Sequence, residues 1–285
     1  MSHLTKTIVI IAICTTIFGC SSMKDPDTKL AKEHAGTESA YYFKAQQSLK
    51  SGQFMAAVEK LNALEERFPF GRYAQQAQLE LIYAHFRNQD YAQADAAADH
   101  FIRLYPTHSQ VDYALYVKGL STFNLDRSIF QAVLPTDLSQ RDMGAARESF
   151  QHFEALVRKH PNSPYYEDSR ARMLFLRNML AEHEIHVAKY YLRREAYVAA
   201  VNRGSYIVQN FQKTTAVAEG LDIMVQAYYA LALNELADDT RKILDHNYPN
   251  YYSNKPFLLL KLNRAREHKQ EETSWFNKLT RGFFS

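Results

Sequence analysis

Glycine and proline are scarce in this chain of 285 residues, which has nine of the former and eight of the latter. The turns of a β-sandwich or β-barrel need many more of these residues, so a β-rich fold is nearly excluded. Alanine occurs 34 times, beside 19 tyrosines and 17 phenylalanines. Small residues that face large rings are typical of closely packed helices. We therefore expect an all-α protein.

The chain also has no large excess of positive or negative charge, and its mean hydropathy is low. Its 34 lysines and arginines against 31 acidic residues give a formal net charge of +3, too small to suggest a nucleic-acid binder that neutralises phosphates. The apolar content of 46% and the mean hydropathy of −0.41 exclude a polytopic membrane protein and a disordered chain.

Cysteine occurs only twice, at positions 14 and 20. Lys6 precedes an apolar run at 8–13, and this segment is too short to span a bilayer. Ile17-Phe18-Gly19-Cys20 resembles the bacterial lipobox, in which the thiol is acylated and the chain is cut before the cysteine. We therefore predict a signal peptide at 1–19 and a Cys20 that carries S-diacylglycerol and an N-acyl chain. An ordinary signal peptide with an incidental Cys20 is the alternative.

The residues after Cys20 predict a destination and a tether. Ser21 and Ser22 stand where lipoprotein sorting rules would place Asp in a protein that stays in the inner membrane, so we expect passage to the outer membrane. Residues 20–37 are polar and aperiodic, which favours a lipidated tether. The mature chain keeps no thiol for a disulfide or for a metal site.

A recurring pair, in which an aromatic residue or histidine precedes proline, divides the rest of the chain. The pairs are Phe68-Pro69, Tyr105-Pro106, His160-Pro161 and Tyr248-Pro249, and the first two prolines are 37 residues apart. Helix–turn–helix units of about 34 residues that close with proline match the tetratricopeptide pattern. We expect an α-solenoid of about five helix pairs over 38–249. The predicted helices span 38–51, 54–68, 71–87, 91–104, 109–125, 142–159, 164–190, 194–211, 214–235 and 237–247, with a long loop before 142 and an overlong helix at 164–190 that packs across two neighbours.

The sequence contains no recognisable motif for catalysis or for binding a metal or a cofactor. His183-Glu184-Ile185-His186 places its histidines three residues apart, whereas a zinc motif on a helix needs four, so a solvated helix face is favoured over a metal site. No nucleophile elbow, dinucleotide fingerprint or phosphate-binding loop is found in the sequence. We therefore expect a binding protein, not an enzyme, without a metal or a cofactor other than the covalent lipid.

Two stretches go beyond generic repeats, Arg67 to Ala84 and Phe101 to His108, and the likeness continues at Ala196 to Arg203. Their residues resemble the BamD family, the tetratricopeptide lipoproteins of the outer-membrane β-barrel assembly (BAM) complex, and the resemblance covers about 38–249. Gln212, where a fourth repeat would close with proline, and a long tail after 249 depart from the family pattern.

The resemblance implies a lipid-anchored protein that faces the periplasm of a Gram-negative bacterium and binds unfolded outer-membrane protein precursors, its clients. It also implies that the protein docks on the POTRA region of BamA and that BamC and BamE are further partners in the same complex. For client binding we predict a groove on the N-terminal repeats, and Phe86 joins it only by its helical spacing from Tyr83. The groove residues are Phe68, Tyr73, Gln76, Tyr83 and Phe86.

For BamA docking we predict Arg203 as the polar anchor with Tyr197 beside it, on the C-terminal repeats. Alternatives remain at each site: the rings could be core residues that seal one repeat on the next, and Arg203 could pair within its own repeat. A periplasmic tetratricopeptide lipoprotein that scaffolds cell-wall synthesis or binds peptidoglycan is the alternative function. In the tail, 250–285, Trp275, Leu279 and Phe283 share a helix face, which suits a membrane surface or a partner groove, whereas Gly282 favours a disordered end.

Overall fold

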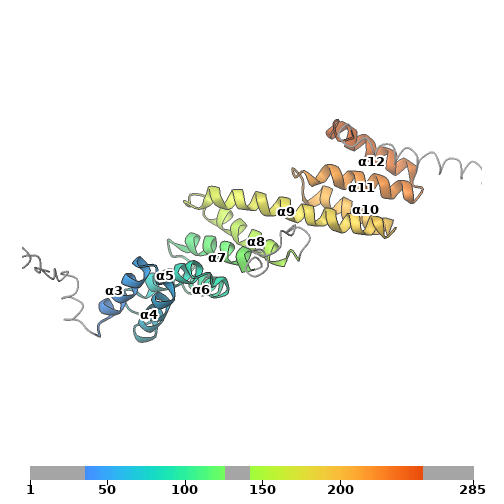
Figure 1. The fold of residues 1–285 in the computed structure, drawn as a ribbon. Coiled ribbons are helices and arrows are strands. Elements are labelled where there is room, and N and C mark those ends of the chain that lie inside the picture. Colours follow the sequence, from blue (N-terminus) through green and yellow to red (C-terminus); the bar gives the residue numbers. More distant parts are fainter. Residues whose placement is uncertain (1–35, 126–141, 253–285) are drawn as a thin grey trace, which may run out of the picture. The chain divides into compact units, whose positions relative to one another are not determined.

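A computed structural model describes residues 36–125 and 142–252, and all regular structure within these ranges is helical (Figure 1). This confirms the all-α prediction. The chain divides into a first compact unit that ends at Leu81 and a second that begins at Ile82. The described helices are α3 (Glu38–Lys50), α4 (Phe54–Arg67), α5 (Ala74–Arg87), α6 (Tyr91–Leu104), α7 (Val111–Leu125), α8 (Gly144–Lys159), α9 (Tyr166–Arg193), α10 (Tyr197–Asn210), α11 (Ala216–Ala230) and α12 (Asn234–Asn247).

Helix pairs are the repeating unit, and alanines lie where their helices touch. In the first unit α3 packs on α4, and in the second each helix from α6 to α12 packs on the next. On α6, Ala94 and Ala98 are fully buried beside the ring of Phe101, which is the combination of small and large residues that the composition predicts. Helix α9 contacts α8, α10 and α11, which confirms that the longest helix packs across its neighbours.

The turns inside four of the five described helix pairs share one backbone conformation. Gly52, Gln89, Glu195 and Ala232 each have a positive φ, between 59° and 73°. At Gly52 the amide donates to the carbonyl of Leu49, and the next amide reaches back to Ser48; the other three turns repeat these two hydrogen bonds. This arrangement ends a helix by satisfying its last carbonyl groups. In these four pairs it separates the two helices by only three residues, whereas residues 126–143 separate α7 from α8.

The turns between pairs use a different stop signal. Phe68, Tyr105, His160 and Tyr248 each cap a helix, donate their amide to the carbonyl four residues earlier and precede a proline. Proline disfavours the helical conformation at the residue before it, which favours a helix end there. Phe211 has the same cap with Gln212 in place of proline, and the following Lys213 turns the chain with a φ of 68°.

The predicted helix bounds differ from the observed ones mainly near the C-terminus. We expected a helix over 214–235, but α11 ends at Ala230 and α12 begins at Asn234, three residues before the predicted 237. The cause is Ala232, which takes the left-handed turn conformation although alanine favours helix. Helix α5 begins at Ala74, not 71, because Gly71 and Tyr73 still belong to the preceding turn. None of the helices in the described ranges is long and apolar enough to cross a membrane.

The last helix pair is closed by two tyrosines that follow Pro249. Tyr252 is 7% exposed, and its hydroxyl donates to Asp222 Oδ1 on α11 at 2.8 Å. Tyr251 donates to Oδ2 of the same carboxylate at 3.2 Å, and Gln226 also donates to it. Burial and this carboxylate raise the pKa of both tyrosines. The chain is therefore packed on α11 as far as Tyr252.

Candidate functional site

In the first unit, Tyr73 is held against α3 by a neighbouring tyrosine. The rings of Tyr42 and Tyr73 stack with centroids 4.3 Å apart and an interplanar angle of 10°. The Tyr42 hydroxyl donates to Glu80 Oε1 at 2.7 Å, and the exposed Gln76 donates to the same oxygen at 2.9 Å. Burial, followed by the Glu80 carboxylate, raises the pKa of Tyr42. Tyr73 and Gln76, which we predicted to bind clients, thus converge on Glu80 and Tyr42.

Phe68 lies beside the other tyrosine of α3. Its ring meets Tyr41 edge-on at 5.9 Å, and Arg67 donates to the Tyr41 hydroxyl at 2.6 Å. Phe68 is only half-buried, so the ring touches both α3 and solvent. Phe70, two residues on, is 98% exposed. The sequence analysis missed Phe70, which lies within the Arg67-to-Ala84 motif, and the α3 residues Tyr41 and Tyr42, whose rings contact it.

In the second unit, the end of α5 carries the other two predicted client residues. Tyr83 is 36% exposed, and its hydroxyl accepts a hydrogen bond of 2.6 Å from Arg87 one turn later. Phe86 is half-buried and contacts Tyr91 of α6 edge-on at 5.6 Å. Tyr83 therefore offers a ring to solvent, whereas Phe86 contributes to packing between α5 and α6.

On the C-terminal repeats, Arg203 is paired with a buried carboxylate. Arg203 Nη1 on α10 lies 3.0 Å from Glu184 Oε2 on α9, and Glu184 is 3% exposed. Arg147 Nη2 on α8 lies 3.4 Å from the other oxygen of Glu184. Tyr197 packs against the hydrophobic cluster that α9, α10 and α11 share. The pairing left open in the sequence analysis is present, but 43% of the Arg203 side chain remains exposed, so the docking role stays a prediction.

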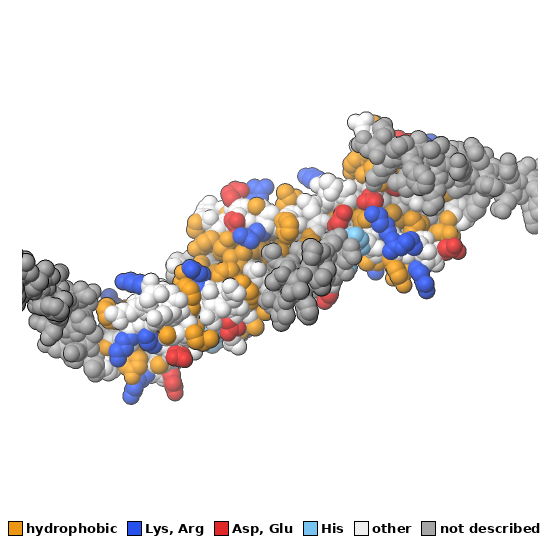
Figure 2. Space-filling view, in the orientation of Figure 1, with side chains coloured by type: hydrophobic (Ala, Val, Ile, Leu, Met, Phe, Trp, Pro, Cys, Tyr) orange, Lys and Arg blue, Asp and Glu red, His pale blue; other side chains and the backbone are white. Residues whose placement is uncertain are grey.

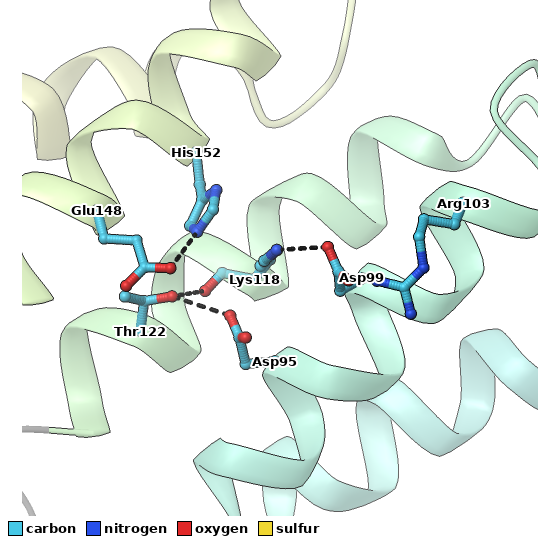
Figure 3. Close-up of polar contacts among 7 residues, drawn as sticks. All are labelled: Asp95, Asp99, Arg103, Lys118, Thr122, Glu148 and His152. Carbon is cyan, nitrogen blue, oxygen red and sulfur yellow. Dashed lines mark hydrogen bonds and ion pairs between the residues drawn. The ribbon is translucent and has the colours of Figure 1, made fainter.

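A second group of polar side chains lies on α6, α7 and α8 (Figure 3). Lys118 Nζ donates to Asp99 Oδ1 at 2.8 Å, and Thr122 donates to Asp95 Oδ1 at 3.0 Å. His152 Nε2 lies 3.6 Å from Glu148 Oε1. Burial, helped by the positive charge of Lys118, lowers the pKa of His152. The first two contacts join α6 to α7, and the third lies within α8.

Large hydrophobic side chains are also exposed on the surface of the second unit. Figure 2 shows hydrophobic side chains over α9, where Leu174 and Phe175 are 57% and 53% exposed. Among the described residues, no three histidine, cysteine or acidic side chains gather as a metal ion would require. Cys20 and the tail from 253 onward, to which we assigned the lipid and an amphipathic segment, lie outside the described residues.

Helix pairs with a shared turn, alanine contacts and rings at the surface define a tetratricopeptide-like repeat protein. Comparison with known proteins shows which family of repeat proteins the chain resembles. The YfiO family, described as an outer membrane lipoprotein, matches residues 34–244. Three curated relatives, each named outer membrane protein assembly factor BamD, come from Vibrio cholerae, Neisseria meningitidis serogroup B and Xylella fastidiosa.

These relatives are similar over most of their length. The chain is 39% identical to the Vibrio protein over 233 residues, covering 81% of this chain and 93% of the relative. Identity to the Neisseria protein is 38% over 253 residues, with 89% and 93% covered. Identity to the Xylella protein is 31% over 277 residues, with 94% and 93% covered. The chain belongs to the BamD family of outer membrane lipoproteins.

Proposed function

We propose that this protein is a subunit of the outer-membrane β-barrel assembly machinery that binds unfolded outer-membrane protein precursors and docks on the POTRA region of BamA. Family membership is the observation that carries this proposal, because the curated relatives are named assembly factors. BamC and BamE are further expected partners. The proposal includes a lipid anchor on Cys20, a periplasmic orientation and no enzymatic activity, cofactor or metal.

The exposed rings support the client-binding part of the proposal. An extended peptide that adds to a repeat surface gains affinity from a few aromatic anchors and from main-chain hydrogen bonds. Tyr83 and the half-buried Phe68 supply rings, and Gln76 supplies an exposed amide. The alternative of a peptidoglycan-binding scaffold is not favoured, since the curated relatives carry assembly-factor names.

Affinity purification from solubilised outer membranes tests the proposal. The tagged full-length chain should co-isolate a large β-barrel protein with POTRA domains, whereas co-isolation of cell-wall synthases would contradict it. Arg203→Ala should release the barrel protein, because removing one partner of a desolvated charge pair costs about 2–5 kcal/mol of binding free energy. Binding of a client peptide should survive the same change, because the predicted client rings lie on other helices.

A further inference from the structure

Helix α12 is the last helix of the described repeats (Figure 1). Helices α8 and α10 are the second helices of the two preceding pairs, and each packs between two other helices. Among the described helices, α12 has an extensive contact with α11 alone. Repeat proteins need a terminal element that covers the end of the array. In the described part of the chain, α12 therefore has a face that no neighbouring helix covers.

The earlier pairs show which residues of α12 form this face. Asp95, ten residues before the residue that caps α6, accepts a hydrogen bond from Thr122 of the next helix, α7. Gly204, seven residues before the residue that caps α10, lies against the next helix, α11. Counted back from the cap of α12, the same two positions are Asp238 and Arg241. The open face of α12 is therefore the one that carries Asp238 and Arg241.

The chain itself is led onto this open face directly after α12. The amide of Tyr251 donates to the carbonyl of Tyr248 at 2.9 Å. The same hydrogen bond, from the third residue after a helix cap back to the cap, precedes α5, α7, α9 and α11, which are the first helices of their pairs. The ring of Tyr252 then lies 5.6 Å from the guanidinium of Arg241. The backbone after α12 thus follows the path by which the earlier repeats begin.

The residues after Tyr252 also repeat a burial pattern of these first helices. On α7 and on α11, the positions 9, 10, 12 and 14 residues after the preceding helix cap are all buried. They are Ala114, Leu115, Val117 and Gly119 on α7, and Gly220, Leu221, Ile223 and Val225 on α11. Counted from Tyr248, the same positions hold Phe257, Leu258, Leu260 and Leu262. The segment that follows Tyr252 therefore has apolar side chains where a repeat helix buries them.

Charge favours contact between this segment and α12. Helix α12 carries four acidic and two basic residues, a formal charge of −2, and Asp245, one turn after Arg241, is 53% exposed. Residues 253–269 carry five basic residues and one glutamate, a formal charge of +4. Opposite charges attract across such a contact, whereas a second copy of α12 would bring like charges together.

We propose that residues 254–269 of this chain dock on the open face of α12 and end the repeat array there, as the unpaired first helix of a sixth repeat. The four apolar side chains from Phe257 to Leu262 pack against α12 as those of α7 pack against α6. A partner that binds the C-terminal end of the array then meets residues 254–269, not the bare face of α12.

Hydrogen exchange of the detergent-solubilised full-length chain, followed by mass spectrometry, tests this docking. The amides of α12 should exchange on the order of tenfold faster in a chain that ends at Tyr252 than in the wild type, because the helix opens more readily without its cover. A chain that ends at Lys269 is the matched control and should exchange as the wild type does. A synthetic peptide of residues 253–269 should restore slow exchange to the chain that ends at Tyr252, and less so at high salt.

A substitution in the intact chain tests the same contact without shortening the protein. Leu262→Asp places a charge at a position that we expect to be buried, which is strongly unfavourable, so it should speed the exchange of α12 as the truncation at Tyr252 does. Leu279→Asp is the same change outside the docking segment and should leave the exchange of α12 as in the wild type.

Three results would overturn the proposal. The first is wild-type exchange of α12 both in Leu262→Asp and in the chain that ends at Tyr252. The second is slow exchange of α12 only at concentrations where the full-length chain sediments as a dimer, which would assign the open face to a second copy. The third is slow exchange that requires anionic phosphatidylglycerol vesicles, which would assign the face to the membrane surface.

Discussion

Gly204 of α10 and Gly220 of α11 face each other where the two helices pack. A Cβ atom on Gly204 would lie 2.7 Å from the Gly220 carbonyl oxygen and 2.5 Å from Met224 Cγ, and a Cβ on Gly220 would lie 3.4 Å from the Gly204 carbonyl oxygen. The backbones therefore approach more closely than any residue with a side chain allows. This contact joins the fourth described helix pair to the last one.

Gly204→Ala should destabilise the second unit by about 1–3 kcal/mol, because the added methyl group forces the two backbones apart. Urea unfolding followed by circular dichroism measures the loss. The control is Gly144→Ala at the start of α8, where the new Cβ would make only an ordinary contact of 3.4 Å with Asp142. That change should be neutral or slightly stabilising. A neutral Gly204→Ala would show that α10 and α11 are less tightly packed than the structure describes.

The sequence predicts the helices well where a residue forces the backbone to turn. Proline after Phe68, Tyr105, His160 and Tyr248 marks four closing turns, and each marked helix ends within one residue of its predicted bound. At Ala232 the side chain gives no such signal, so the prediction missed the turn by several residues. Tertiary packing of α12 on α11, not local propensity, determines that turn.

The candidate site is less predictable than the fold because pairing depends on three dimensions. The motif around Phe68 and Tyr73 identified two rings, but not the α3 tyrosines that hold them. The Arg203 motif likewise gave no indication of Glu184, which is 19 residues earlier in the sequence. Its neighbours His183 and His186 suggested a metal motif instead. Only the helix packing shows that Glu184 is buried between arginines.

His152 should make the stability of the second unit depend on acidity. Its side chain is 17% exposed, and burial lowers its pKa below the ordinary value of 6.5. As the pH falls, the unfolded chain therefore takes up a proton at this position before the folded chain does. The free energy of unfolding is fully retained above about pH 6.5 and decreases below it. Urea titrations between pH 7.5 and pH 5 (about the range in which histidine titrates) measure this slope.

Replacing the imidazole isolates the effect of His152. His152→Gln should flatten the dependence of the unfolding free energy on pH, since glutamine takes up no proton. His246→Gln, at an exposed position of α12, is the control and should leave the slope unchanged. Equal slopes in the wild type and in His152→Gln would assign the acid sensitivity to other groups.

Tyr252 should stabilise the C-terminal end through its hydroxyl. Tyr252→Phe removes a donor from the buried Asp222, which should cost about 1–3 kcal/mol of unfolding free energy. Because the folded protein raises the pKa of Tyr252 above the ordinary value of 10, this stabilisation is retained below about pH 10 and lost as the pH rises further. Thermal unfolding at pH 8 and pH 10.5 (about either side of the ordinary tyrosine pKa) measures both effects. Tyr248→Phe is the control, and an equal loss in both variants would contradict a specific role of the Asp222 contact.

Cys20→Ala should release the protein from the membrane. Each buried CH₂ of an acyl chain contributes about 0.8 kcal/mol to anchoring, so several chains on one residue hold the protein firmly. The variant should be unprocessed or miscleaved and should appear in the soluble fraction, as judged by mass spectrometry and by fractionation. Cys14→Ala lies within the predicted signal peptide and should be processed and anchored normally. Normal mass and membrane retention of Cys20→Ala would refute the lipid anchor.

Rings that bind clients should be separable from rings that hold the fold. Phe70 is 98% exposed, so Phe70→Ala should change the unfolding free energy by no more than about 0.5 kcal/mol. If the ring is a hot spot, the same change should lower affinity for a precursor peptide by about 2 kcal/mol or more, and Tyr83→Ala should act in the same direction.

Tyr73→Ala loses the stack on Tyr42 and should also destabilise the first unit, by about 0.5–1.5 kcal/mol. Leu236→Ala, half-exposed on α12, is the control for the loss of a surface hydrophobic group. Peptide binding that is the same for Phe70→Ala, Tyr83→Ala and Leu236→Ala would place the client site elsewhere.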